Sequence, residues 1–354
     1  MLAATGVHKN FMKNHLIFIG LILLAGSFFF YFLVRVILNY PVLNGVYATN
    51  SKLTNIEWIP LGTYIGPEDV AIDAQGLIYC GTKDGNILRF QEDKSLPEVY
   101  ANTGGRPQGL HFDINNNLIV ADTHKGLLSI SPDGTITILS TEQAEIPFGF
   151  TNDLDIAADS TIYFSDSSYQ SSPSKFIEHH PHGRLLSYNP FSKNTRLLLD
   201  NLNFANGVAV SPDQSFVLVA ETQAYRVTRY WLTGDRKGES DIFIDNLPGL
   251  PDGISSNGKD TFWLSLYELR NPFLNAIFPF PLIKKIIMRL PIHSVFVKKR
   301  YGFILGLDIY GHIVYNLQDP SKSSYSPITS VEEHGRFLYL GSNVQNAVGR
   351  IQVH

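Results

Sequence analysis

Short apolar runs separated by polar turns dominate the chain from Ile56 to its end. The clearest example is Phe204–Thr222, in which the apolar runs Val208–Val210 and Phe216–Ala220 flank a turn that contains Pro212. Two short apolar runs joined by a Pro-Asp turn are typical of a β-hairpin. This stretch therefore predicts a hairpin and serves as a template for the rest of the chain.

The same arrangement recurs along the chain at a spacing of roughly 40–50 residues, which is the range expected for propeller blades. The matching units begin at Asp69, Gly109, Asp153, Asn206, Asp252 and Ile328. No amphipathic helical pattern interrupts them. The sequence therefore predicts an all-β fold, a six-bladed β-propeller over residues 56–354. We expect Glu57–Pro60 to supply the outer strand of the last blade and close the ring.

The N-terminal pattern is different, because Leu16–Val34 contains no charged residue. As a helix this run would extend roughly 28 Å, close to the thickness of a bilayer core. A cleaved signal peptide is the alternative, but the run is long for one and ends in bulky Phe and Tyr residues. Lys9 and Lys13 precede the run, and basic residues stay on the cytoplasmic side.

This pattern predicts a cytoplasmic tail at residues 1–15, a transmembrane signal anchor at 16–38 and a stalk at 39–55. The protein would be a single-pass type II membrane protein with its propeller on the non-cytoplasmic side. A second segment with membrane character is Asn271–Arg300, which mixes Phe, Ile, Leu and Pro with Lys and Arg and has no acidic residue. It is either a long loop packed over one blade or a membrane-facing insertion at the lipid surface.

Composition narrows the possible partners. Hydrophobic residues make up 44% of the chain, the net charge is -4 and the pI is about 6.2, so no basic excess indicates a nucleic-acid partner. Cys80 is the single cysteine, which excludes an internal disulfide and disfavours a Cys/His zinc site.

A polar residue precedes the first strand of nearly every unit. In a propeller the first strands line the central channel, so these residues should converge on one ring. Carboxylate and amide oxygens without sulfur suit a hard divalent cation, Ca²⁺ first. The alternative for any one of them is an ordinary turn-forming residue. The ring comprises Glu68, Gln108, Asn152, Asn206 and Asp252, with Asp69 and Asp153 directly behind two of them.

These motifs carry a resemblance. The chain is similar to the strictosidine synthase-like family, in particular to its membrane-anchored branch, which is related to gluconolactonases and paraoxonases. The resemblance covers residues from about Ile56 onward and implies a six-bladed propeller. The motifs occur in the order Gly66–Val70, Arg106–Leu110, Asn152–Asp155, Ile162–Ser168, Gly183–Leu185, Asn206–Val208, Phe216–Thr222, Leu247–Asp252 and Leu338–Ser342.

The related calcium hydrolases imply a set of metal ligands. Carried over, the ligands are Glu68, Asn206 and Asp252, with Asn152 as a fourth ligand or a substrate-orienting group. Gln108 stands where paraoxonases have a channel histidine, and we expect it to contact substrate.

Two further positions depart from the related families. Thr329 occupies the position of the catalytic Glu of true strictosidine synthases, which argues against amine–aldehyde condensation. Gly253 replaces a possible ligand of close relatives but matches the Pro-Asp-Gly form of gluconolactonases. His111 and His124 lie near the ring in sequence, yet not at matching positions, and are expected to be blade residues.

The favoured hypothesis is a membrane-anchored, Ca²⁺-dependent hydrolase of small esters or lactones, with Asp153 or Asp252 as the general base. No Gly-x-Ser-x-Gly motif favours a serine hydrolase. The alternatives are a non-catalytic binding propeller with a structural calcium and, less favoured because of Thr329, a condensing enzyme of the strictosidine synthase type.

Overall fold

The computed structural model describes residues 19–20, 23–31, 43–91, 96–169, 181–271 and 300–353. The chain divides into two compact units, residues 1–41 with 270–296 and residues 42–269 with 297–354. In the first unit, residues 19–20 and 23–31 are helical. The described residues contain no helix with the length and apolar character needed to cross a membrane. The predicted anchor at 16–38 and insertion at 271–300 fall largely outside the described residues and stay predictions.

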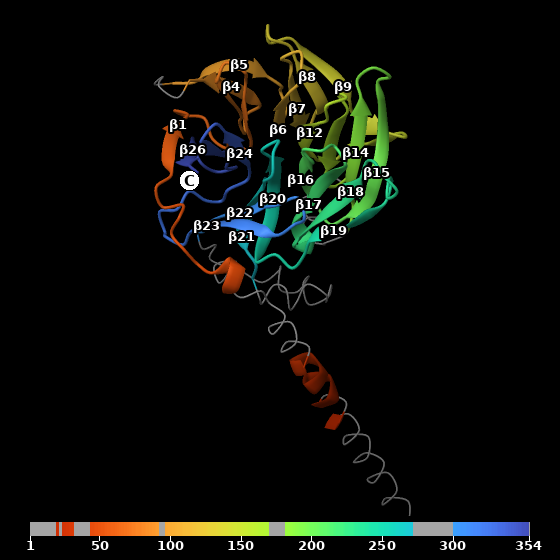
Figure 1. Cartoon of the computed structure of the whole chain (residues 1–354), viewed down its shortest axis with the longest axis vertical. Helices are drawn as coiled ribbons and strands as arrows, with labels where there is room; N and C mark the ends of the chain where they lie inside the picture. The colour runs from red at the N-terminus through yellow and green to blue at the C-terminus, as the bar shows by residue number, and fades with distance from the viewer. Residues whose placement is uncertain are drawn as a thin grey trace, which may run out of the picture. The chain divides into compact units, whose positions relative to one another are not determined.

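The second unit contains six four-stranded antiparallel sheets, which confirms the predicted β-propeller (Figure 1). Blade 1 consists of β2 (Val70–Ile72), β3 (Ile78–Gly81), β4 (Asn86–Phe90) and β5 (Glu98–Asn102). Blade 2 consists of β6 (Pro107–Phe112), β7 (Leu118–Asp122), β8 (Gly126–Ile130) and β9 (Ile136–Ser140). Blade 3 consists of β12 (Thr151–Ile156), β13 (Ile162–Asp166), β14 (Gly183–Asn189) and β15 (Asn194–Leu202).

Blade 4 consists of β16 (Ala205–Val210), β17 (Phe216–Glu221), β18 (Arg226–Trp231) and β19 (Ser240–Ile244). Blade 5 consists of β20 (Gly249–Ser256), β21 (Phe262–Leu269), β22 (Gly302–Leu307) and β23 (Ile313–Asp319). Blade 6 consists of β24 (Val331–His334), β25 (Phe337–Leu340), β26 (Ala347–Gln352) and β1 (Glu57–Pro60). The remaining elements are the hairpin β10 (Glu142–Gln143) and β11 (Ile146–Pro147) and two short 3₁₀ turns, η1 (Gly45–Tyr47) and η2 (Thr222–Ala224).

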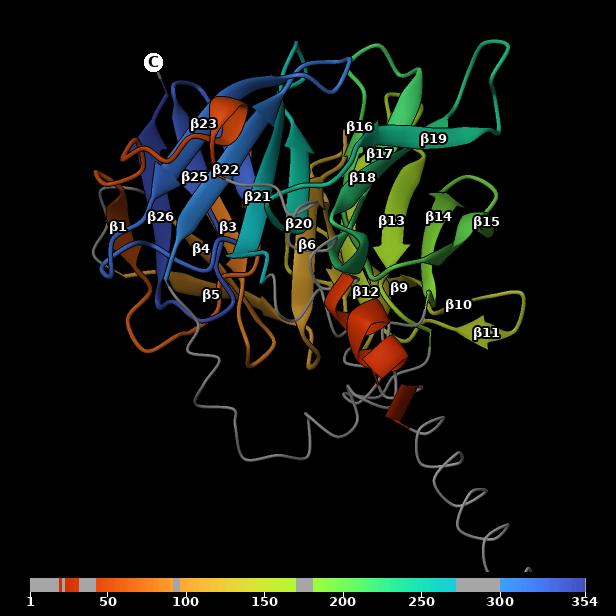
Figure 2. The ribbon, with the colours of Figure 1, turned by 90° about the horizontal axis from the view of Figure 1, so that it is seen from below.

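The last blade joins the two ends of the propeller sequence. Strand β1 pairs antiparallel with β26, with Ile59 opposite Val348 (Figures 1 and 2). The predicted closing strand at Glu57–Pro60 is therefore confirmed. Backbone hydrogen bonds between the first and last strands hold the ring closed.

Burial falls from the centre of each blade to its outside. Every residue of β16 and β17 is buried, whereas the outer strand β15 is mostly exposed or half-buried. Continuous apolar runs therefore form the inner strands, because blades pack on both faces there. Successive inner strands β2, β6, β12, β16, β20 and β24 contact one another around the centre.

Glycines allow the inner strands to approach closely. A Cβ at Gly207 would lie 2.5 Å from the carbonyl oxygen of Asp252, and a Cβ at Gly253 would lie 2.5 Å from that of Thr329. Neither position accommodates a side chain while the strands keep this spacing. The residues that precede these glycines, Asn206 and Asp252, are thereby brought close together in the channel.

Candidate site in the central channel

The predicted ring residues lie around one small cavity at the start of the inner strands. The cavity has a volume of about 20 Å³, enough for one water molecule or one ion. The structure brings together all the candidate residues of the sequence analysis. The lining side chains are Glu68, Asp69, Gln108, Asn152, Asp153, Asn206, Asp252, Thr329 and Ser330.

Three hydroxyl residues orient the three amides of the ring. The side-chain nitrogens of Gln108, Asn152 and Asn206 donate to the hydroxyl oxygens of Thr123, Ser167 and Thr222, at 2.9, 2.9 and 3.1 Å. Each hydroxyl belongs to the same blade as the amide that it contacts.

The direction of these hydrogen bonds follows from a second contact. Ser167 Oγ donates its only proton to the carbonyl oxygen of Ala205, at 2.6 Å, and Thr222 Oγ1 donates to that of Pro251, at 2.8 Å. Each hydroxyl therefore accepts from the amide nitrogen, which assigns the amide orientation. Among the described residues, the side-chain oxygens of Asn152 and Asn206 accept no hydrogen bond, so both are left for a ligand.

Buried carboxylates fix the loops that carry the amides. Asp122 Oδ1 accepts from the backbone nitrogen of Arg106, and Asp166 Oδ1 accepts from that of Phe150, at 2.9 and 2.8 Å. Glu221 Oε2 plays the same part in blade 4, where it accepts from the backbone nitrogen of Asn203 at 2.9 Å. All three carboxylates are fully buried. An acid followed by a hydroxyl residue at the end of the second strand thus positions the ring residue of blades 2, 3 and 4.

The two carboxylates of the ring, Glu68 and Asp252, differ in how their negative charges are compensated. Glu68 forms an ion pair with Arg106, with Oε2 2.8 Å from the guanidinium nitrogen and both side chains about 15% exposed. Burial raises the pKa of Glu68 to about 7, although Arg106 opposes the shift. Burial and the charge of Glu68 raise the pKa of Asp252 well above its usual range, while a hydrogen bond from Asn206 opposes that shift.

The donor set fits a hard divalent cation. Two carboxylates and two amides of four different blades face the cavity, and oxygen is the ligand atom that Ca²⁺ takes. Gln108 Oε1 is a further buried oxygen, and it has no hydrogen-bond partner among the described residues. Those residues contain no cluster of three or more His, Cys, Asp or Glu side chains arranged to hold a metal. Any ion held here would therefore depend on the amide oxygens.

Thr329 completes the ring in blade 6. Its hydroxyl donates to the backbone carbonyl of Glu68 at 2.6 Å and so links the last blade to the first. The position at which a condensing enzyme of the strictosidine synthase type has a carboxylate thus holds a hydroxyl that serves the ring closure.

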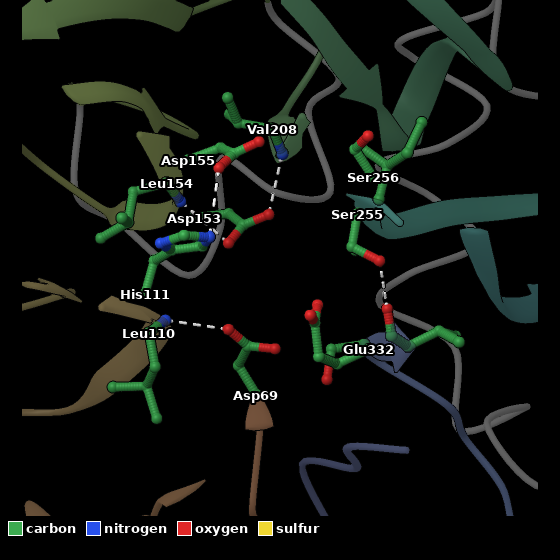
Figure 3. A pocket seen from close by; sticks show the side chains of 14 residues that line it. Asp69, Leu110, His111, Asp153, Leu154, Asp155, Val208, Ser255, Ser256 and Glu332 are labelled. Carbon is green, nitrogen blue, oxygen red and sulfur yellow. Dashed lines mark hydrogen bonds and ion pairs between the residues drawn. The ribbon is translucent and has the colours of Figure 1, made fainter. Parts of the chain in front are cut away.

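A second chamber of about 50 Å³ lies further along the channel and shares Asp69 and Asp153 with the first (Figure 3). Its additional side chains include His111, Asp155 and Glu332, each three positions after a ring residue. His111 Nε2 lies 3.4 Å from Asp155 Oδ1. Backbone nitrogens of the next blade hold the shared pair, since Leu110 donates to Asp69 and Val208 to Asp153, both at 2.8 Å.

The carboxyl groups of the second chamber have raised pKa values. Burial raises the pKa of Asp69 to about 6 and that of Asp155 above its usual range. Burial and the neighbouring carboxylates raise the pKa values of Asp153 and Glu332 well above the usual range. All four carboxyl groups therefore favour the protonated form more than exposed carboxyl groups do.

Sequence reasoning did not identify three groups that the structure adds: the orienting hydroxyls, the Arg106 counter-ion and the second chamber. The hydroxyls had a signal in the sequence, because an acid and a hydroxyl residue follow each other at the end of the second strand in three blades. The dipeptides are Asp122-Thr123, Asp166-Ser167 and Glu221-Thr222. His111 lines the second chamber and His124 is exposed at a turn, so neither joins the ring.

Comparison with known proteins identifies relatives of this chain. Residues 152–235 match the strictosidine synthase family model, and residues 45–90 match the model for the N-terminal part of strictosidine synthase-like proteins. Strictosidine synthase-like protein 6 of Arabidopsis thaliana is 35% identical over 82% of this chain and 80% of its own length. Human adipocyte plasma membrane-associated protein is 33% identical over 85% of this chain and 79% of its own length.

Solved structures share the fold at lower identity. A gluconolactonase of Xanthomonas campestris aligns with a TM-score of 0.62 and 16% identity over 85% of this chain and 91% of its own. Regucalcin of Agrobacterium tumefaciens, described as a calcium-binding protein, aligns with a TM-score of 0.60 and 14% identity over 83% of this chain and 92% of its own.

Proposed function

The chain belongs to the strictosidine synthase-like family, and from that premise we propose that it is a membrane-anchored, calcium-dependent hydrolase of small esters or lactones. The observation that carries the proposal is the ring, in which Asn152 and Asn206 turn their free amide oxygens toward a cavity that Glu68 and Asp252 also face. The gluconolactonase and the calcium-binding regucalcin with the same fold support this choice of reaction and ion.

Glu68, Asn152, Asn206 and Asp252 would hold the calcium ion. When bound, the ion supplies a Lewis acid for the carbonyl oxygen of the substrate. Because Gln108 Nε2 is engaged by Thr123, the free Gln108 Oε1 is available to accept a substrate hydroxyl.

The general base is Asp153 or Asp252. Asp153 accepts hydrogen bonds from the backbone nitrogens of Leu154 and Val208, which keep its carboxylate fixed between the two chambers. Its pKa is raised by burial and by the charge of Asp69, in the direction that suits a base working near neutral pH. Asp252 has the same direction of shift but is engaged by Asn206.

A binding propeller without catalysis is the second candidate, and the Arg106–Glu68 ion pair favours it. That pair already compensates the charge of Glu68, so the ring is electrostatically tolerable without an ion. In a binding propeller the channel would recruit a ligand, and no turnover would be observed.

One experiment separates the two. Hydrolysis of phenyl acetate and of a small lactone by the purified full-length chain is followed with EGTA and then with excess Ca²⁺, beside the double variant Glu68→Ala/Asp252→Ala. We expect activity that disappears with EGTA, returns with Ca²⁺ and is absent in the variant. Activity that persists in EGTA would contradict the metal hydrolase. Absent activity with a Ca²⁺-dependent melting temperature would favour the binding propeller.

A further inference from the structure

A cavity larger than either chamber of the channel lies elsewhere in the propeller. It is a groove of about 620 Å³ between blades 3 and 4, within the usual range of small-molecule sites. It begins at Ala157, directly after the inner strand that starts beside Asn152. Five residues of extended chain span roughly 16 Å, so the groove is separate from the ring.

The groove has an ordered floor. Tyr163 is 8% exposed and belongs to the core shared by blades 3 and 4, and Leu198, Tyr230 and Leu232 pack against that core. The hydroxyl groups of Tyr163 and Tyr230 form no hydrogen bond within the part of the chain that the structure describes. Burial raises the pKa of Tyr163 to about 12, so its hydroxyl remains a proton donor at neutral pH.

The walls supply hydrogen-bonding groups and positive charge. Hydroxyl and amide side chains make up most of the walls. Among the described residues, Arg196 and Lys237 have no carboxylate within ion-pair distance, and Asp159 is the one acid that lines the groove. A protein of net charge -4 thus carries a groove in which cations outnumber acids. The wall side chains include Thr161, Ser187, Asn189, Ser192, Asn194, Gln214 and Thr233.

Arg196 departs from a cross-strand pair that three of the six blades contain. At the corresponding position of the two outer strands, blade 1 pairs Arg89 with Glu98 and blade 4 pairs Arg229 with Asp241. Blade 6 pairs Arg350 with Glu57 in the same way.

In blade 3 the residue opposite Arg196 is Ser187. The register is equivalent, because Arg89 and Ser187 both lie beside a second-strand tyrosine, Tyr79 and Tyr163. Ser187 therefore occupies the position that the arginine has in blades 1, 4 and 6, and Arg196 occupies the position of the acid. Blade 3 thus has no carboxylate in this pair, and its arginine lines the groove.

We infer that this groove binds an acidic oligosaccharide, whose carboxylates contact Arg196 and Lys237 and whose hydroxyl groups contact the tyrosine hydroxyls and the wall amides. A polyhydroxylated anion matches both the unpaired cations and the hydroxyl and amide groups of the walls. This binding is independent of the proposed hydrolase activity, since no groove residue lies in the channel.

The test is calorimetric titration of the full-length chain with trigalacturonic acid, beside the neutral trisaccharide maltotriose. We expect the wild type to bind the acidic trisaccharide at least about tenfold more tightly, because only its carboxylates form charge-assisted hydrogen bonds with Arg196 and Lys237. No binding of trigalacturonic acid, or equal binding of maltotriose, would overturn the inference.

Two variants and one control locate the binding. Arg196→Gln should weaken it at least about tenfold. Ser187→Asp should weaken it as strongly by giving Arg196 a carboxylate on the neighbouring strand, in the reverse order of the pairs in blades 1, 4 and 6, while leaving the melting temperature unchanged or higher. Arg89→Gln, which removes the arginine of the equivalent cross-strand pair in blade 1, should bind like the wild type. Wild-type affinity in Arg196→Gln, or an equal loss in Arg89→Gln, would place the binding elsewhere.

Discussion

The two chambers of the channel are here called the upper chamber, which is the first cavity at the ring, and the lower chamber, which is the second one. They share Asp69 and Asp153 but differ in how the charges of their carboxylates are compensated. The upper chamber interleaves carboxylates with amides, and a neutral amide oxygen adds a ligand atom without adding repulsion. The lower chamber adds Asp155 and Glu332 and has His111 as its one basic side chain. Amides at these positions thus lower the repulsion between carboxylates in an oxygen-lined channel, whereas carboxylates at the same positions raise one another's pKa.

The largest difference between the chambers should appear on replacing one side chain in each. Asn152→Ala removes an oriented amide oxygen from the upper chamber and should lower kcat/KM for the ester at least about 100-fold, as the loss of a group that stabilises the transition state does. Glu332→Gln, the matched change in the lower chamber, should keep most of the activity. Steady-state kinetics, with melting temperatures to verify folding, measure both. Equal losses in the two variants would mean that the chambers act as one site.

A smaller effect is expected from the hydroxyl that orients Asn152. Ser167→Ala frees the amide to rotate, so Ca²⁺ affinity measured by calorimetry should fall about tenfold, within the range for a lost outer-shell partner. Ser167→Thr should restore it, because Thr123 and Thr222 perform the same task in blades 2 and 4. Calcium binding that is unchanged in Ser167→Ala would make this hydroxyl merely structural. A wild type that binds no calcium would instead refute the proposed cofactor.

Sequence reasoning predicted the propeller and its closing strand because both depend on local patterns. Apolar runs such as Phe216–Ala220 recur with turns between them, and equivalent positions before the first strands must meet at the axis. The sequence alone was therefore enough to predict that the ring residues, from Glu68 to Asp252, converge in the channel.

What could not be predicted depends on contacts between residues distant in sequence. The hydrogen bond from Ser167 to Ala205 crosses between blades, and the position of Arg196 opposite Ser187 requires the strand register. Predicting the lower chamber also required the register of the strands. Ala71 and Asp155 occupy equivalent positions, and only the sum over six blades shows where carboxylates accumulate.

The smallest expected effect is on the stability of the folded protein, through the titration of Glu332 in the lower chamber. Burial and the charges of Asp69, Asp155 and Asp153 raise the pKa of Glu332 well above its value in the unfolded chain. The folded state thus holds this proton more tightly than the unfolded state does. The resulting stability is fully present below the unfolded pKa of about 4.3 and is lost as the pH rises toward the raised folded value.

Glu332→Gln removes this titration, so its advantage over the wild type should grow with pH. We expect nearly equal melting temperatures at pH 5 and a gain of about 2 °C at pH 8, the change that about 1 kcal/mol produces in a protein of this size. Thermal unfolding in EGTA measures it, and Glu142→Gln, at an exposed glutamate, should give no such trend. A gain that is larger at pH 5 than at pH 8 would show that Glu332 is ionised and compensated, which would make the lower chamber resemble the upper one.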